Sequence, residues 1–250
     1  MQKIFYSFFL FFLITASVFG ARRGDVKVIE ASENIRYLSQ KIVKEYLFLY
    51  QYPSRFHIQK ESVKTLNSLN NNFKIIARIT KNSDTKDILD FLAYGKDNMI
   101  EILKKSPTKD NCSLMLDYSE MLIEGVNSIE QLHKYNFSKE EKMLIVSKKM
   151  EYLIERMGKY YLAIHLDFDK VSNQEFMDET MGMFDENLKE MNLYDYPQKT
   201  MIKKLNYYWR ANKVLLNKTR NIFVSDIMFL SLDFIRELVS NISSYHNKNQ

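Results

Sequence analysis

The side chains that most often carry chemistry in proteins are few and scattered in this sequence. Its four histidines and single cysteine lie far apart, at His57, Cys112, His133, His165 and His246. They form no zinc or haem-attachment motif, and there is no pair of Glu-x-x-His segments for a di-iron bundle. A glycine-rich phosphate loop and a nucleophile motif are also missing. We therefore expect no metal, no cofactor and no catalytic residue, and we predict that the protein is not an enzyme.

The charged residues indicate solvated helix faces. The net charge is +5 at pH 7, but Lys and Arg are interspersed with Asp and Glu along the chain. A nucleic-acid site would gather its basic residues on one face or in one run. We therefore expect no nucleic-acid partner.

The elements that must hold these side chains are helices. Only six glycines and three prolines occur in 250 residues, and Pro53, Pro107 and Pro197 lie between periodic segments. Ser138-x-x-Glu141 and Ser172-x-x-Glu175 have the pattern of capping boxes. Apolar residues at helical spacing form a seam in the fifth segment, through Met143, Val146, Met150, Leu153, Met157, Tyr160 and Ile164. The sequence predicts an all-α protein with helices at about 25–52, 57–80, 85–105, 111–135, 139–168, 173–191, 197–218 and 222–246.

The chain contains an internal repeat of about 115 residues. This shift aligns Tyr37-Leu38 with Tyr152-Leu153, and Lys44 with Lys159. One more residue of shift aligns Leu116-Asp117-Tyr118 with Leu232-Asp233-Phe234. Matches that keep their order along the chain predict two tandem antiparallel four-helix bundles, in modules 21–136 and 137–250. Residues 1–20 are set apart as a signal peptide.

The first predicted helix resembles a known family. Residues 29–44, IEASENIRYLSQKIVK, resemble the opening helix of the type IV pilus methyl-accepting chemotaxis transducer N-terminal domain, a PilJ-type and NarX-like sensor domain. The match keeps Arg36, Leu38, Ser39, Gln40 and Lys44. In the second, more degenerate module the same pattern keeps Leu153, Arg156, Met157 and Lys159. Together with the repeat, the resemblance covers essentially the whole chain after residue 20.

The resemblance implies a sensory role outside the cytoplasm. In nitrate-binding relatives the arginine at the position of Arg36 contacts the anion, between the first helices of two subunits. This implies a candidate anion site at Arg36, Ser39 and Gln40, with nitrate as an example of its ligand. Guanidinium and amide donors suit a planar anion where water is partly excluded.

Departures from the family pattern leave an alternative open for Arg36. Glu33 stands where the family has glycine, and Asn34 stands where it has a second arginine. Arg36 could instead form an ion pair with Glu33, three residues before it on the same helix. In the second module Glu151 occupies the arginine position, so we expect no anion site there.

The N-terminus predicts export. Lys3 precedes the apolar run from Ile4 to Ala16, and small or tolerated residues before Ala21 suit cleavage after Gly20. An uncleaved anchor helix is the alternative, but Arg22 and Arg23 would then lie on the exported side, against the positive-inside tendency. We expect a secreted, periplasmic protein.

The expected function is that of a periplasmic ligand-binding or sensory accessory protein. Its expected partners are a small anion, a membrane receptor or other protein, and a second copy of the chain through the first helix. The alternative is a structural or assembly protein whose bundles only mediate contacts. The aromatic group Tyr207, Tyr208 and Trp209 is assigned to the core, with an interface as the alternative.

Overall fold

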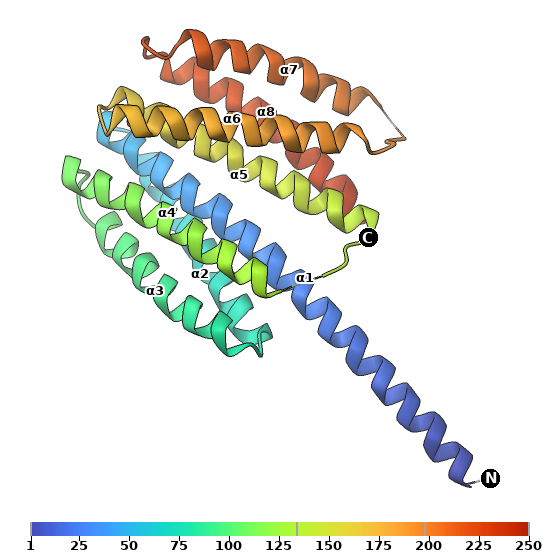
Figure 1. Cartoon of the computed structure of the whole chain (residues 1–250). Coiled ribbons are helices and arrows are strands. Elements are labelled where there is room, and N and C mark those ends of the chain that lie inside the picture. Colours follow the sequence, from blue (N-terminus) through green and yellow to red (C-terminus); the bar gives the residue numbers. More distant parts are fainter. Residues whose placement is uncertain (1, 134, 198, 250) are drawn as a thin grey trace.

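The structure is a computed structural model. It describes the backbone of residues 2–133, 135–197 and 199–249, and side chains within these ranges from Gly24 on, except that of Phe56. The described residues form eight helices and no strand, which confirms the all-α fold class. Their bounds are α1 Gln2–Gln51, α2 Phe56–Ile79, α3 Ser83–Leu103, α4 Lys109–Leu132, α5 Lys139–His165, α6 Lys170–Asn192, α7 Lys199–Lys218 and α8 Ser225–Lys248 (Figure 1).

The helix ends follow local capping chemistry, with one correction to the sequence prediction. Ser138 and Glu141 form the expected capping box at the start of α5. The predicted box at Ser172 is wrong, because α6 begins at Lys170 and is capped by Asp169, whose side chain accepts from the Ser172 amide at 3.2 Å. Asp167 and Asp169 have φ angles of 61° and 26°, and this turn ends α5 at His165 instead of residue 168.

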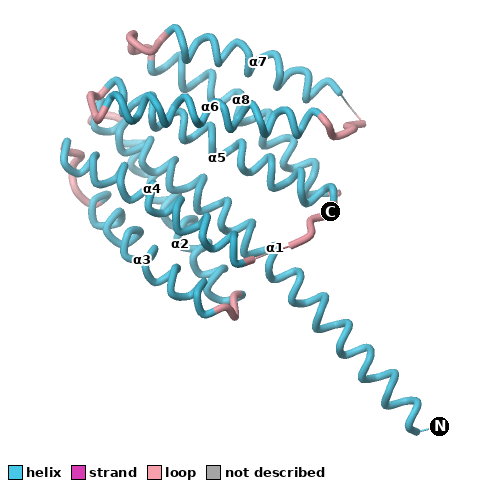
Figure 2. The backbone as a smooth tube through the Cα atoms, viewed as in Figure 1, coloured by secondary structure: helices cyan, strands magenta, loops and turns pink. Residues whose placement is uncertain are grey.

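The helices form two sets of four that meet along α1 and α5. In the first set α1 packs against α2 and α4, and α3 packs against α2 and α4. The second set repeats these contacts with α5 to α8 in the places of α1 to α4. Figures 1 and 2 show α1 and α5 side by side in the middle, with α3 and α7 on opposite outer sides. We call the contact between α1 and α5 the seam.

The repeat in the sequence is visible in the helix bounds. Helices α4 and α8 both have 24 residues, and α8 starts 116 residues after α4. Helix α3 has 21 residues and α7 has 20, again with starts 116 residues apart. The third and fourth helices of each half therefore begin at equivalent points of the repeat.

The apolar cores of the two sets are not separate. The core around α1 to α4 includes Leu162, Ala163 and Phe168 from the second half. The core around α5 to α8 includes Ile123 from α4, and Phe229 packs against both cores. The apolar stripe predicted for α5, from Met143 to Ile164, is buried along its whole length. Nearly all other residues between Met143 and Ile164 are buried as well. A helix buried on every face is a central helix, which the one-sided periodicity of its sequence did not indicate.

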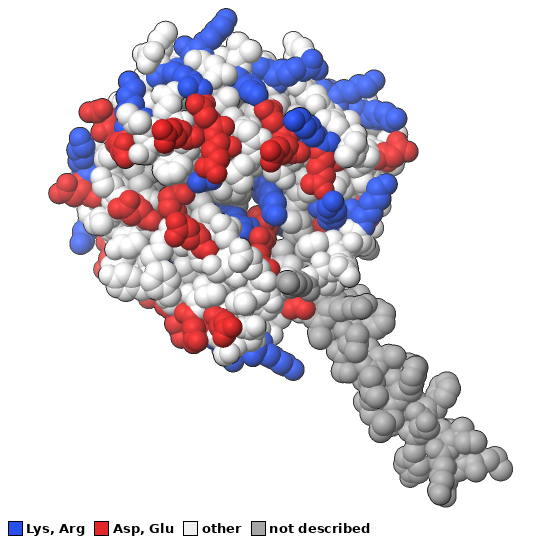
Figure 3. Space-filling model, in the orientation of Figure 1, with Lys and Arg blue, Asp and Glu red and all other residues white. Residues whose placement is uncertain are grey.

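Surface and terminal features complete the description. Basic and acidic side chains are interspersed on the face shown in Figure 3. In the part of the chain whose side chains are described, no helix is long and apolar enough to cross a membrane. The predicted signal peptide, residues 1–20, lies outside the described side chains and stays a prediction.

Two glycines give a matched test of the packing. A Cβ at Gly125 in α4 would lie 2.4 Å from a methyl carbon of buried Leu92 in α3, whereas a Cβ at Gly182 in α6 would meet no atom within 4 Å. We expect Gly182→Ala to raise the free energy of unfolding by about 0.5–1 kcal/mol, because alanine favours helix. Gly125→Ala should be less stable than Gly182→Ala by about 1–3 kcal/mol, the usual cost of overpacking. Urea unfolding of both variants measures this difference, and equal stabilities would contradict the close α3–α4 packing.

Candidate functional site

The seam contains charged side chains that are almost fully buried. Charged residues rarely occur at such depth unless they are paired, so each of them is expected to contact a group of opposite charge or a hydrogen-bond partner. We group them as the Arg36 cluster (Glu33, Arg36, Asn127, Glu130), the Lys44 cluster (Lys44, Glu155, Arg236) and the Lys159 cluster (Ser119, Glu120, Arg156, Lys159). All three connect α1 or α5 with neighbouring helices.

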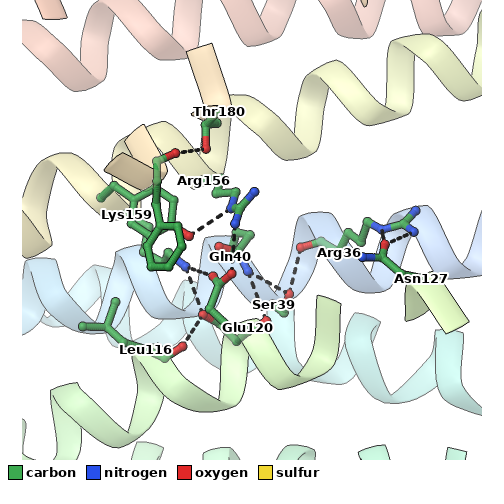
Figure 4. A network of polar contacts seen from close by, with 12 residues as sticks. Arg36, Ser39, Gln40, Leu116, Glu120, Asn127, Arg156, Lys159 and Thr180 are labelled. Carbon is green, nitrogen blue, oxygen red and sulfur yellow. Dashed lines mark hydrogen bonds and ion pairs between the residues drawn. The ribbon is translucent and has the colours of Figure 1, made fainter. Parts of the chain in front are cut away.

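The Arg36 cluster joins α1 to α4. Arg36 is 4% exposed, and its Nη1 donates to Glu33 Oε1 at 2.5 Å. Its Nη2 donates to Glu130 Oε2 at 2.8 Å. The same nitrogen donates to Asn127 Oδ1 at 2.5 Å (Figure 4). The Glu33 ion pair considered from the sequence is therefore present, but it is buried and belongs to a larger cluster.

The two carboxyl groups of this cluster differ in their electrostatics. Burial raises the pKa of Glu33 to about 8, against the opposing charge of Arg36. Burial raises the pKa of Glu130, but the hydrogen bond and charge of Arg36, the hydrogen bond with Glu33 and the charge of Lys149 together outweigh it and hold this pKa below its usual value. Near neutral pH the favoured state has a proton on Glu33 and a negative charge on Glu130.

The other two candidate residues are also buried. The Ser39 hydroxyl donates to the backbone carbonyl of Arg36 at 2.8 Å. Gln40 Nε2 donates to the Ser119 carbonyl and to the Ser39 hydroxyl, both at 3.4 Å, whereas Gln40 Oε1 has no hydrogen-bond partner among the described residues (Figure 4). The structure thus places Arg36, Ser39 and Gln40 along one buried stretch of α1. Their role in anion binding stays a prediction.

The face of α1 that carries Ser32, Arg36, Ser39 and Val43 is enclosed within this chain, although the sequence predicted a contact with a second chain through this helix. Ser32, Ser39 and Val43 are 0% exposed, and Arg36 is nearly so. Helix α5, the first helix of the second half, packs on α1. The chain therefore pairs its own two first helices, and a homodimer through this face would have to displace α4, whose Asn127 and Glu130 contact Arg36.

A polar cavity lies at one end of the seam. It has a volume of about 640 Å³, and we call it the bundle-end cavity. Both first helices line it, together with the end of α4 and the segment that follows: Asp25, Ile29, Glu130, His133, Tyr135, Asn136, Phe137, Ile145 and Lys149. Lys149 Nζ lies 3.8 Å from Glu33 Oε1, so Lys149 and Glu130 connect this cavity with the Arg36 cluster.

His133 is held by two partners at the cavity wall. Its Nδ1 lies 2.8 Å from Asp25 Oδ1, and its Nε2 lies 2.9 Å from the Thr85 hydroxyl. The order carboxylate, imidazole, hydroxyl is that of a catalytic triad, but Thr85 is 0% exposed and closed to a substrate. The second half has a similar arrangement in which His246 contacts Glu140 at 2.7 Å and Tyr196 at 3.1 Å. Both arrangements join the ends of helices.

The two remaining clusters occupy equivalent places in the repeat but differ in charge. Lys44 Nζ pairs with Glu155 Oε2 at 2.6 Å across the seam. In the second half the position equivalent to Glu155 is Gln40, which has no charge, and the equivalent Lys159 pairs with Glu120 of α4 instead. The position equivalent to Glu120 in α8 is Arg236, which lies 3.5 Å from Glu155. The repeat thus places one buried acid in each cluster, but on different helices.

The cavity residues Glu130, His133 and Lys149 were not predicted as site residues from the sequence. One signal was present, because Glu130-x-x-His133 places two polar side chains on one face near the end of a helix. Lys149 carried no such signal. A search of protein-family models, of curated proteins and of solved structures finds no significant match to this chain. What the site does must therefore be inferred from its own geometry and charge.

Proposed function

We propose that the protein is a sensory or ligand-binding accessory protein outside the cytoplasm, and that it holds a small anion such as nitrate in the bundle-end cavity. The observation that carries the proposal is the position of this cavity between α1 and α5, with Lys149 in its wall. The resemblance to PilJ-type sensor domains implies a site between two first helices, and here both belong to one chain.

The charge of the cluster behind the cavity favours an anion. With a proton on Glu33, the groups Arg36, Lys149 and Glu130 have one positive charge more than negative, while the carboxylate of Asp25 in the cavity wall faces His133 at 2.8 Å. An anion beside Lys149 would balance this charge in a partly enclosed place, where electrostatic interactions are stronger than in water. Binding would also hold α5 against α1. A receptor or other partner protein that contacts these helices would then detect the bound state through this change in their packing.

A thermal-unfolding series tests the proposal. We expect nitrate to raise the melting temperature above that in chloride at equal ionic strength. The stabilisation should approach about 2.7 kcal/mol when nitrate is in hundredfold excess over its Kd. Lys149→Ala should remove the difference between nitrate and chloride, because it removes the cation in the cavity wall.

Lys142→Ala is the matched control. Lys142 lies on the same helix but pairs with Glu190 at 2.5 Å, and it does not line the cavity. This variant should respond to nitrate as the wild type does. Identical melting temperatures of the wild type in nitrate and chloride would contradict the anion proposal.

A structural or assembly role is the second candidate. Exposed apolar side chains recur at equivalent places of the outer helices, with Phe91 matching Tyr207 and Leu114 matching Leu230. In the aromatic group assigned to the core, Trp209 is buried, but Tyr207 is exposed and available for contacts. Repeated exposed apolar positions suit a protein that contacts partners on both sides. A screen in which no small molecule stabilises the protein would favour this role.

A further inference from the structure

A second cavity lies on the other side of the seam, between α1, α2, α5 and α8. It has a volume of about 260 Å³, and we call it the α1–α8 cavity. Phe48 of α1 and Phe229 of α8 form part of its wall, with their ring centroids 5.4 Å apart. Ligand pockets usually measure about 300–1,000 Å³, so this slightly smaller cavity would take a ligand of few heavy atoms.

One buried acid in its wall lacks a full set of partners. Glu45 is 8% exposed, and its Oε1 lies 3.8 Å from Lys41 Nζ. Its Oε2 has no hydrogen-bond partner among the described residues. Burial raises the pKa of this carboxyl, although Lys41 and Ser62 act in the opposite direction. A buried acceptor without a partner destabilises the empty protein, and a donor placed in the cavity would remove that cost.

Cationic groups line the same cavity. The guanidinium of Arg55 lies over the Phe48 ring, 5.1 Å from its centroid, and its side chain is 41% exposed. Its nearest carboxylate is that of Asp226 at 3.6 Å, which is exposed. Arg55 can therefore turn to a ligand carboxylate without leaving a buried acid unpaired. Lys41, 27% exposed at its side chain, is a second cation at the wall.

The repeat supplies a comparison within the same molecule. An equivalent cavity of about 270 Å³ lies beside the Lys159 cluster, and the position equivalent to Glu45 is Tyr160. The Tyr160 hydroxyl accepts from Arg156 Nε at 3.0 Å and is thus satisfied within the protein. The position equivalent to Arg236 is Glu120, so this cavity also loses a cation. Of these two equivalent cavities, the α1–α8 cavity is the one whose described residues combine an unsatisfied acid with accessible cations.

We propose that the α1–α8 cavity binds a small zwitterion of the amino-acid class. Its ammonium group donates to Glu45, and its carboxylate accepts from Arg55 and Lys41. The apolar part of the ligand packs against Phe48 and Phe229. The site shares no residue with the bundle-end cavity, so it stands or falls independently of the anion proposal.

Calorimetric titration of the full chain tests the proposal, with glycine, L-alanine, L-valine and L-leucine as probes. Acetate and methylammonium supply the two charged halves separately. We expect at least one amino acid to bind, and each half to bind at least about tenfold more weakly. Glu45→Gln should weaken amino-acid binding by about 10- to 100-fold, because a charge-assisted hydrogen bond is lost.

Three further variants make the result decisive. Arg55→Gln, at a half-exposed position, should also weaken binding and replaces Glu45→Gln as the test if that variant does not fold. Glu101→Gln, at an exposed carboxylate paired with Lys104, and Lys149→Ala should both bind as the wild type does. The proposal is overturned if no amino acid binds with a Kd below roughly 10 mM, or if both cavity variants bind with unchanged affinity.

Discussion

Replacing Arg36 with alanine is expected to lower the free energy of unfolding by about 3–5 kcal/mol, the usual result of removing one partner from a buried ion pair. The variant leaves Glu33 and Glu130 facing each other without the guanidinium that both contact. Urea unfolding at pH 7 measures the loss. The loss should shrink as the pH falls below the ordinary range of glutamate, because Glu130, whose pKa is lowered by Arg36, is then protonated in both proteins.

An exposed pair of the same chemistry is the control. Arg220 contacts Asp178 through two nitrogens, but their side chains are 34% and 49% exposed. Arg220→Ala should therefore cost less than about 1 kcal/mol. Equal losses in the two variants would show that the Arg36 cluster is open to water in solution.

Separating the chain into residues 21–136 and 137–250 is expected to abolish cooperative unfolding in both fragments. The cut separates Lys44 from Glu155, and it separates Lys159 and Arg156 from Glu120, so it removes three ion pairs between the two halves. It also exposes the face of α5 that packs on α1, including Leu162 and Ala163. Both effects lower the free energy of unfolding of each fragment, and small domains have only about 5–15 kcal/mol of stability to lose.

Circular dichroism during thermal unfolding of each fragment measures the effect. A mixture of the two fragments should regain a cooperative transition, because the seam can form again between separate chains. If either fragment alone unfolds cooperatively, the two modules are independent bundles, as the repeat in the sequence suggested.

The sequence by itself determined the local structure of this protein. Scarce glycine and proline, apolar residues at helical spacing and the Ser138 capping box predicted the helices, because these features act within a few residues of one another. The start of α6 was predicted wrongly, because local pattern alone does not choose between two possible capping residues. Asp169 and Ser172 both offer a capping side chain, and the path of the turn after His165 selected Asp169.

The sequence also predicted which helices are equivalent, but not what lies between them. A shift of 115 residues aligns Lys44 with Lys159; Lys159 is fully buried and Lys44 is partly buried, with 18% of its side chain exposed. Their partners differ, however, because the acid comes from α5 in one case and from α4 in the other. No pattern of spacing within a helix contains that information.

Only the tertiary structure decided the environment of Arg36. Within its own helix Arg36 can reach residues three or four positions away, so the sequence could indicate Glu33 as a partner. Asn127 and Glu130 are 91 and 94 residues distant along the chain, and only the packing of α4 against α1 brings them close. Removing one partner of such a pair costs a few tenths of a kcal/mol on an exposed helix and about 3–5 kcal/mol where another helix excludes water. The sequence could therefore predict the contact between Arg36 and Glu33, but the cost of breaking it depends on burial, which is a property of the assembled helices.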